Sequence, residues 1–169
     1  VEVVLLNPED TSKLDALGAA RKTFVLEWIT AGGGTVQIQD LDEAIEQLHY
    51  FAKSEDIEHI QEAEDDKEKR KRFNEFWERN NPNPGSAVNA ALVEYYGRVA
   101  YANRHFKHFQ PGWRTDRGMV FILYGPPTYI ESHPMESDTR PYAVWEYFDL
   151  NKRFIFVDHT GFGDFRLLY

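Results

Sequence analysis

The spacing of apolar residues predicts helices across the middle of the chain. Residues 40–53 carry an apolar side chain at every third or fourth position, and Asp40 stands where a helix cap belongs. A second helix is expected to begin at Ser54, because two acidic residues follow it and suit the positive end of a helix. In the charged run 62–72 the acids precede the bases, which indicates a solvated helix surface.

The longest predicted helix follows a break at NNPNPG (80–85) and extends to about Phe109. Asn83 or Ser86 is expected to cap it. We expect this helix to be the central spine of the domain. Its apolar positions recur at steps of three and four: Val88, Leu92, Tyr95, Val99, Ala102, Phe106 and Phe109.

Beyond residue 118 the pattern changes to that of strands. MVFILY (119–124) is continuously apolar and predicts a central strand, GPP (125–127) predicts a turn, and residues 132–141 predict a polar loop. Because the remaining spacers are short, we expect neighbouring strands to pair as an antiparallel meander. The further expected strands are YAVWEYF (142–148), RFIFVD (153–158) and FRLLY (165–169).

The first 39 residues show a weaker pattern. VEVVLLN (1–7) predicts a short strand, while residues 23–30 and 35–39 flank three glycines and predict a hairpin. This hairpin could belong to a preceding domain.

Helices followed by strands predict an α+β domain over residues 40–169. Its expected architecture is a helical N-terminal half whose long central helix packs on a small antiparallel C-terminal sheet. Residues 1–39 are treated as a separate N-terminal segment.

Composition narrows the class of protein. The 169 residues are 42% hydrophobic and 15% aromatic, which favours a packed core over disorder. A net charge of −9 argues against nucleic acid and against an anionic membrane surface. The absence of cysteine excludes disulfides and thiolate zinc sites. No apolar run is long enough for a transmembrane helix and no signal peptide is visible. Because the chain begins at Val1, we expect a fragment or a processed form.

Five stretches, taken in order, resemble the GWxTD domain family of bacterial envelope or exported proteins over residues 40–169. The chain departs from the usual family pattern at Thr128, where an acid is common, and at Asn81, where Asp often precedes the proline. The resemblance implies a domain of a larger protein on the periplasmic or extracellular side of the bacterial envelope, and it supplies no catalytic residues. The stretches are FWERNNPNPG (76–85), NAALVEYYGRVAYANRHF (89–106), PGWRTDRGMVFILYGPP (111–127), YAVWEYF (142–148) and RFIFVDHTGFGDFRLL (153–168).

The motif GWRTDRG (112–118) permits a structural and a functional interpretation. Trp113 is either a packing anchor or a stacking surface for a sugar or peptide. Thr115 and Asp116 can fix a turn through backbone hydrogen bonds, and Asp116 can also pair with an arginine such as Arg114 or Arg117. The competing interpretation makes Asp116 a general base or a metal ligand.

A second candidate group lies at strand ends and turns. His159 stands beside Asp158 and could form an acid–base pair with it. Asp116 and Asp164, with Arg117 and Arg166, complete the group. An arginine–aspartate network that braces loops explains the same residues, and no serine or cysteine nucleophile motif accompanies them.

One histidine pair has a spacing compatible with metal binding. His105 and His108 are three apart on the long helix, but they lack the glutamate of a metalloprotease motif and are interpreted as two surface histidines. No cofactor or metal is expected.

Three functional hypotheses follow. The first is a non-catalytic interaction or structural domain whose partner is another protein or another domain of the same polypeptide. The second is a metal- or carboxylate-assisted hydrolase that uses Asp116, Asp158 and His159. The third is a carbohydrate- or peptide-binding module that uses exposed aromatic residues. The candidate binding residues are Trp113, Arg114, Asp116, Arg117, Tyr124, Trp145, His159 and Asp164.

Overall fold

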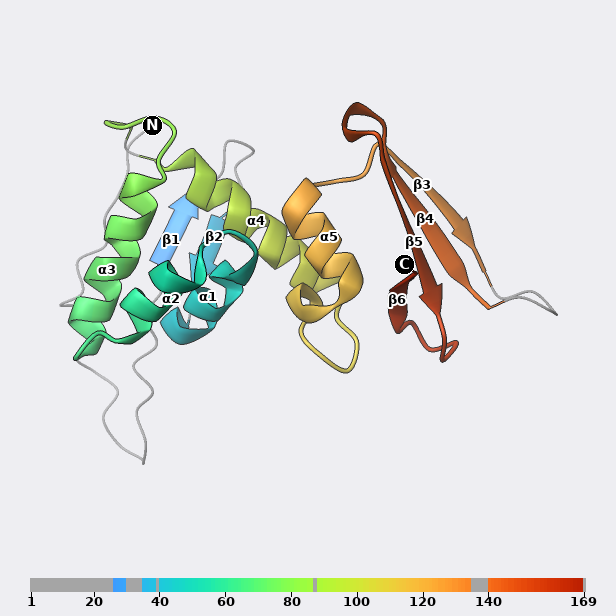
Figure 1. Ribbon diagram of the computed structural model, residues 1–169, viewed down its shortest axis with the longest axis horizontal. Coiled ribbons are helices and arrows are strands. Elements are labelled where there is room, and N and C mark those ends of the chain that lie inside the picture. Colours follow the sequence, from blue (N-terminus) through green and yellow to red (C-terminus); the bar gives the residue numbers. More distant parts are fainter. Residues whose placement is uncertain (1–25, 30–34, 39, 87, 135–139, 169) are drawn as a thin grey trace.

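The fold is elongated, with a helical body at one end and a β-sheet at the other (Figure 1). The computed structural model describes residues 26–29, 35–38, 40–86, 88–134 and 140–168. The strand expected at residues 1–7 lies outside these residues. None of the described helices combines the length and apolar character needed to span a bilayer.

The helical body confirms most of the predicted elements before residue 106. Strands β1 and β2 form the expected antiparallel hairpin, and the helices follow in the predicted order. The elements are β1 (Leu26–Ile29), β2 (Thr35–Ile38), α1 (Leu41–Gln47), the 3-10 turn η2 (Leu48–Tyr50), α2 (Ser54–Gln61), α3 (Asp66–Arg79) and α4 (Ala90–His105).

Side-chain caps fix where these helices begin. The Asp40 carboxylate accepts hydrogen bonds from the backbone N–H groups of Asp42 and Glu43, as the sequence predicts. The cap of α4 is Asn89, so the expectation of Asn83 or Ser86 is wrong. The buried Asn89 amide also donates to the Trp77 carbonyl, which ties the start of α4 to the end of α3.

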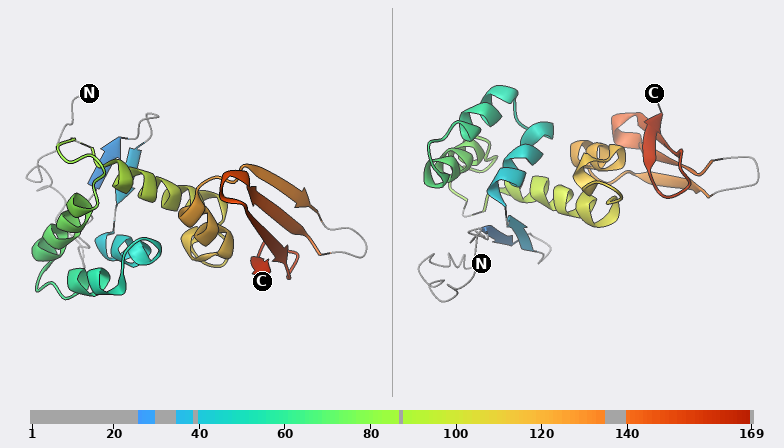
Figure 2. Two further views of the ribbon diagram at one scale, coloured as in Figure 1. Left: turned by 45° about the horizontal axis from the view of Figure 1, so that its top comes forward. Right: turned by 90° about the horizontal axis from the view of Figure 1, so that it is seen from below.

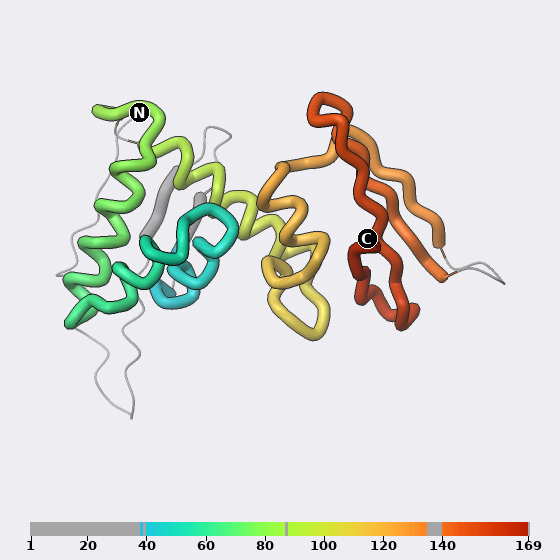
Figure 3. The backbone as a smooth tube through the Cα atoms, viewed as in Figure 1, coloured from blue at the N-terminus to red at the C-terminus, as the bar shows by residue number. Residues whose placement is uncertain are grey.

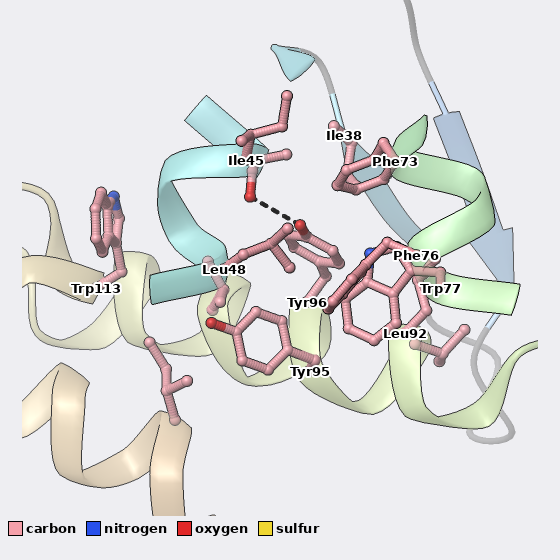
Figure 4. Close-up of a cluster of buried hydrophobic side chains, with 14 of the residues drawn as sticks. Ile38, Ile45, Leu48, Phe73, Phe76, Trp77, Leu92, Tyr95, Tyr96 and Trp113 are labelled. Carbon is pink, nitrogen blue, oxygen red and sulfur yellow. Dashed lines mark hydrogen bonds between the residues drawn. The ribbon is translucent and has the colours of Figure 1, made fainter. Parts of the chain in front are cut away.

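Aromatic residues from α3 and α4 form the centre of the helical core (Figure 4). Trp77 and Phe73 are almost fully buried, and the Trp77 ring lies 5.7 Å from that of Tyr96. The Tyr96 hydroxyl donates to the Ala44 carbonyl of α1 at 2.8 Å. Ile38 of β2 is buried in the same core, so the hairpin contributes to the helical body.

The predicted strand MVFILY is wrong, because residues 116–124 form helix α5 (Asp116–Tyr124). Ile122 packs into the helical core, whereas Val120 and Phe121 pack into a second core against the sheet. A short helix buried on two sides reads as a continuous apolar run, which periodicity cannot distinguish from a buried strand.

The C-terminal sheet is an antiparallel meander in the order β3-β4-β5-β6, which confirms the α+β class. Its first strand covers residues 129–131, where the sequence predicts no strand, and the first two residues of the expected polar loop 132–141. Helix α5, rather than α4, provides the main packing on the sheet (Figures 1 and 2). Helix α4 reaches the sheet core at its end, where the Phe106 ring lies 5.4 Å from that of Trp145. The strands are β3 (Tyr129–His133), β4 (Tyr142–Tyr147), β5 (Lys152–Asp158) and β6 (Phe165–Leu168).

Candidate functional site

The GWRTDRG corner, residues 112–118, lies where the helical body meets α5 and the sheet. Its first three residues form the 3-10 turn η3 (Gly112–Arg114). A Cβ atom added at Gly112 would lie 1.9 Å from the Ala102 carbonyl oxygen of α4. One added at Gly118 would lie 1.9 Å from the Gly112 carbonyl oxygen. Any larger residue at either position would clash with these carbonyl groups. The two glycines therefore allow the backbones of α4, η3 and α5 to pack directly against one another.

Trp113 is a buried packing anchor, with 6% of its surface exposed. Its backbone N–H donates to the Asn103 side chain at 3.0 Å, and its carbonyl accepts from the Tyr50 hydroxyl at 3.1 Å. The Tyr50 ring meets the indole edge-on at 6.3 Å. Burial raises the pKa of Tyr50, which keeps this hydroxyl protonated as a donor.

Arg114 links the corner to the surface of α1. Its Nη2 atom lies 2.6 Å from Glu46 Oε2, and its guanidinium lies 4.7 Å from the Trp113 ring centroid. Both charged side chains of this ion pair are half exposed. The pair therefore covers the tryptophan and contributes little to stability by its charge.

Thr115 and Asp116 begin helix α5 in different ways. The Thr115 hydroxyl donates to the Gly112 carbonyl at 2.7 Å and accepts from the Gly118 N–H at 3.0 Å, which makes it the helix cap. Asp116 Oδ2 accepts from the Leu167 N–H of β6 at 2.7 Å. The predicted arginine pair is replaced by this backbone bond.

Arg117 is held by aromatic rings from both sides of the junction. Its guanidinium lies 4.1 Å from the Phe165 ring centroid and 5.3 Å from that of Phe106. Burial lowers the pKa of Arg117, and the nearby charge of Asp158 opposes that shift. These contacts join α4, α5 and β6.

Asp158 organises the turn between β5 and β6. Its Oδ1 atom accepts from the Thr160 N–H, the Thr160 hydroxyl and the Gly161 N–H, and Oδ2 accepts from the Gly163 N–H at 2.6 Å. Burial raises the pKa of Asp158, but the hydrogen bonds from Gly163, Thr160 and Gly161 outweigh it and hold the pKa below its ordinary value. Only 2% of the residue is exposed.

The remaining members of the proposed acid–base cluster are engaged separately. His159 is exposed, and its Nδ1 atom lies 2.7 Å from Arg140 Nη1. Asp164 pairs with Arg166 at 3.0 Å. Among the residues that the structure describes, no three histidine or carboxylate side chains gather closely enough to hold a metal. The cluster is therefore a set of independent turn and surface contacts, which does not support shared acid–base chemistry.

The expected surface of exposed aromatic residues is wrong for both tryptophans. Trp145 is 3% exposed and packs against Phe156 in the sheet core, while Trp113 is buried as described above. Tyr124 is half-buried against Tyr147. The predicted sugar or peptide stacking surface therefore does not form at these positions.

A shallow cavity of about 230 Å³ lies between η2, α4 and the end of α5. Its lining includes Phe51, Tyr95 and Leu123, with Arg98 and Glu94 forming an ion pair at its rim. It contains none of the candidate catalytic residues. Sequence reasoning missed this cavity, because its residues come from three separate elements without a local motif.

Comparison with known proteins identifies the chain by family. A family model described as GWxTD domain matches residues 26–161. This range includes the hairpin that the sequence division at residue 39 sets apart. No curated protein matches the chain, and no solved structure matches it.

Proposed function

The chain belongs to the GWxTD domain family, and we propose that it is a non-catalytic interaction or structural domain of a larger bacterial envelope-associated or exported protein. The observation that carries this proposal is that the polar groups of the GWRTDRG corner bind within the fold. Thr115 caps α5, Asp116 holds β6 and Arg117 lies between two rings. A catalytic group must reach a substrate, whereas these groups hold elements together.

One face of the sheet, which no described α-helix covers and which we call the uncovered sheet face, supports the interaction part of the proposal. The strand register places Val144, Ile155 and Leu168 in one row across β4, β5 and β6. This row faces away from the core residues Trp145 and Phe156. Leu168 is 55% exposed and Ile155 is half-buried, whereas Val144 is only 2% exposed. All described α-helices lie on the other side of the sheet (Figures 1 and 2). Ile155 and Leu168, at the β5–β6 side of this face, therefore offer an apolar surface without a covering helix, which suits contact with another protein or domain.

For the location, the proposal follows the family resemblance, which implies the periplasmic or extracellular side of the bacterial envelope. An extracytoplasmic domain that carries no chemistry of its own would serve by holding a partner. The partner would be another protein or another domain of the same polypeptide.

The absence of catalysis can be tested with the purified chain. We expect no turnover of ester, peptide, glycoside or phosphoester substrates, with or without added Mg²⁺, Mn²⁺ or Zn²⁺. His159→Gln is the informative variant, because this exposed side chain can be changed without disturbing a core. Turnover that disappears in a folded His159→Gln protein would overturn the proposal.

The interaction can be tested by photocrosslinking in the natural full-length protein. A photoreactive residue at position 168 lies on the uncovered face, and one at Leu150, which is 48% exposed in the β4–β5 turn, is the matched control. We expect a discrete adduct at position 168 that position 150 does not give. Equal or absent adducts at both positions would contradict contact through this face.

A further inference from the structure

Two phenylalanines protrude from neighbouring turns at one end of the molecule. Phe109 follows α4 and is 87% exposed, and Phe162 lies between β5 and β6 and is 79% exposed. These are the highest exposures among the large hydrophobic side chains in the described part of the chain. Single exposed apolar residues are common, but two such rings on adjacent turns indicate a contact surface.

His108 places the two turns side by side. Its ring centroid lies 4.0 Å from that of Phe109. On the other turn, a Cβ atom added at Gly163 would lie 3.6 Å from His108 Cδ2. Figure 3 shows both turns, in yellow and dark red, at the same edge of the molecule. The turns that carry the two phenylalanines therefore meet at His108, and we call this pair of turns the Phe109–Phe162 tip.

Hydrogen bonds hold both turns in place. The Asp158 carboxylate accepts four hydrogen bonds from the turn that carries Phe162, and the Phe162 N–H donates to the Thr160 hydroxyl at 3.2 Å. The His108 N–H donates to the Gln110 carbonyl across Phe109. Because hydrogen bonds already fix the backbone of both turns, binding through the exposed rings would require little reordering of the backbone.

Among the residues that the structure describes, the exposed charges of the two turns are mainly basic. The segment RHFKHF (104–109) contains exposed Arg104 and Lys107 and no acid, and exposed Arg140 lies against His159 of the Phe162 turn. The acids of that turn are neutralised or buried, because Asp164 pairs with Arg166 and Asp158 is enclosed by hydrogen bonds.

The net charge of the chain is unevenly distributed. Residues 1–88 contain 10 Lys and Arg against 19 Asp and Glu, whereas residues 89–169 contain nine of each. The net charge of −9 therefore lies wholly in residues 1–88, and the described helices of this half lie at the helical end of the molecule (Figure 1). An anionic surface would repel that end more than the tip, so the overall charge does not exclude contact through the tip.

We propose that the Phe109–Phe162 tip inserts into the interface of an anionic lipid bilayer, with Arg104, Lys107 and Arg140 facing the lipid headgroups. Transfer of apolar rings from water to the headgroup–acyl boundary is favourable, and basic side chains are attracted to anionic headgroups. Two separate convex rings offer less area than a specific protein interface buries, whereas a bilayer adapts to protruding side chains. The tip shares no residue with the GWRTDRG corner or the uncovered sheet face, so it is independent of the proposed function.

Vesicle flotation tests this inference with the intact chain. Phe109→Ser/Phe162→Ser removes both rings, and Phe148→Ser is the matched control, because Phe148 is 62% exposed at the opposite end of the sheet. We expect the parent to bind vesicles of phosphatidylcholine mixed with phosphatidylglycerol, and to bind more weakly at high salt. The affinity of the double variant for the vesicles should be lower by a factor of roughly ten or more, and the control should bind like the parent. In a separate Phe109→Trp variant, the new indole should be quenched by brominated acyl chains.

Three results would overturn the inference. The first is a parent chain that does not float with the anionic vesicles. The second is a folded double variant, verified by circular dichroism, that binds as well as the parent or the Phe148→Ser control. The third is self-association in light scattering that depends on Phe109 and Phe162 without vesicle binding, which would assign the tip to a protein contact.

Discussion

Asp116 connects two elements that are 51 residues apart in the chain. Its carboxylate stands in the first turn of α5, where the helix dipole favours a negative charge, and it accepts a hydrogen bond from the backbone of β6. Both interactions stabilise the folded state, and both are made by the carboxylate group. At the scale of a single residue, the aspartate of the motif is therefore explained by structure.

Removal of this carboxylate should weaken the fold. We expect Asp116→Ala to lower the free energy of unfolding by about 1–3 kcal/mol, because the Leu167 N–H loses its partner and α5 loses a favourable charge. Asp149→Ala, at an exposed site in the β4–β5 turn, is the control and should change stability by less than about 0.5 kcal/mol. Urea unfolding measures both values, and equal stability of the two variants would contradict this role.

Asp158 should make stability depend on acid pH. Its pKa is lowered in the folded state, so its contribution is present above the ordinary value of 3.8 and is lost as the pH falls through the lower folded value. The parent should therefore lose more stability than Asp158→Asn between pH 5 and about pH 3. Unfolding at both pH values tests this difference, and parallel losses would show that the Asp158 charge is not held by its turn.

At the scale of elements, helices with one apolar face are predictable from the sequence and α5 is not. Residues 40–53 face a single core, so their spacing reveals the helix. Helix α5 lies between two cores and has buried residues on both sides, so its period is hidden. Because residues 119–124 are predicted as the first strand of the sheet, the sequence places that strand too early. The actual first strand, β3, does not alternate between buried and exposed residues, since Tyr129 and Ile130 are both exposed.

For the GWRTDRG corner too, only part of the site can be predicted from the sequence. The residue types of GWRTDRG predict a packing anchor and a capped turn, and the structure places Trp113 and Thr115 in those roles. The partners Tyr50 and Asn103 could not be predicted, because both are brought to Trp113 only by the packing of η2 and α4. The residue types predict an arginine as the partner of Asp116, whereas its partner is the distant backbone N–H of Leu167.

The cap of α5 offers a test at this scale. Thr115→Val keeps the shape of the side chain but removes the hydroxyl that bonds Gly112 and Gly118. We expect a loss of about 1–2 kcal/mol in the free energy of unfolding, whereas Thr115→Ser should retain most of the stability. Equal losses in denaturant unfolding of the two variants would show that the methyl group, rather than the cap, is what the fold requires.

At the scale of the whole molecule, two hydrophobic cores are joined through one corner. The helical core contains Trp113 and the sheet core contains Phe121, and Phe106 packs against both. The stacked backbones at Gly112 and Gly118 set the distance between α4 and α5. Because α5 contributes to both cores, a change in that distance must disturb the two together.

The most direct test of this account compares two Gly→Ala variants by denaturant unfolding. Gly97 lies inside α4 with nothing within 4 Å of an added Cβ, so Gly97→Ala should raise the free energy of unfolding by about 0.5–1 kcal/mol. Gly112→Ala would force a Cβ against the α4 backbone and should lower it by about 3 kcal/mol or more. If Gly112→Ala were as stable as Gly97→Ala, the corner would not be the rigid junction described here.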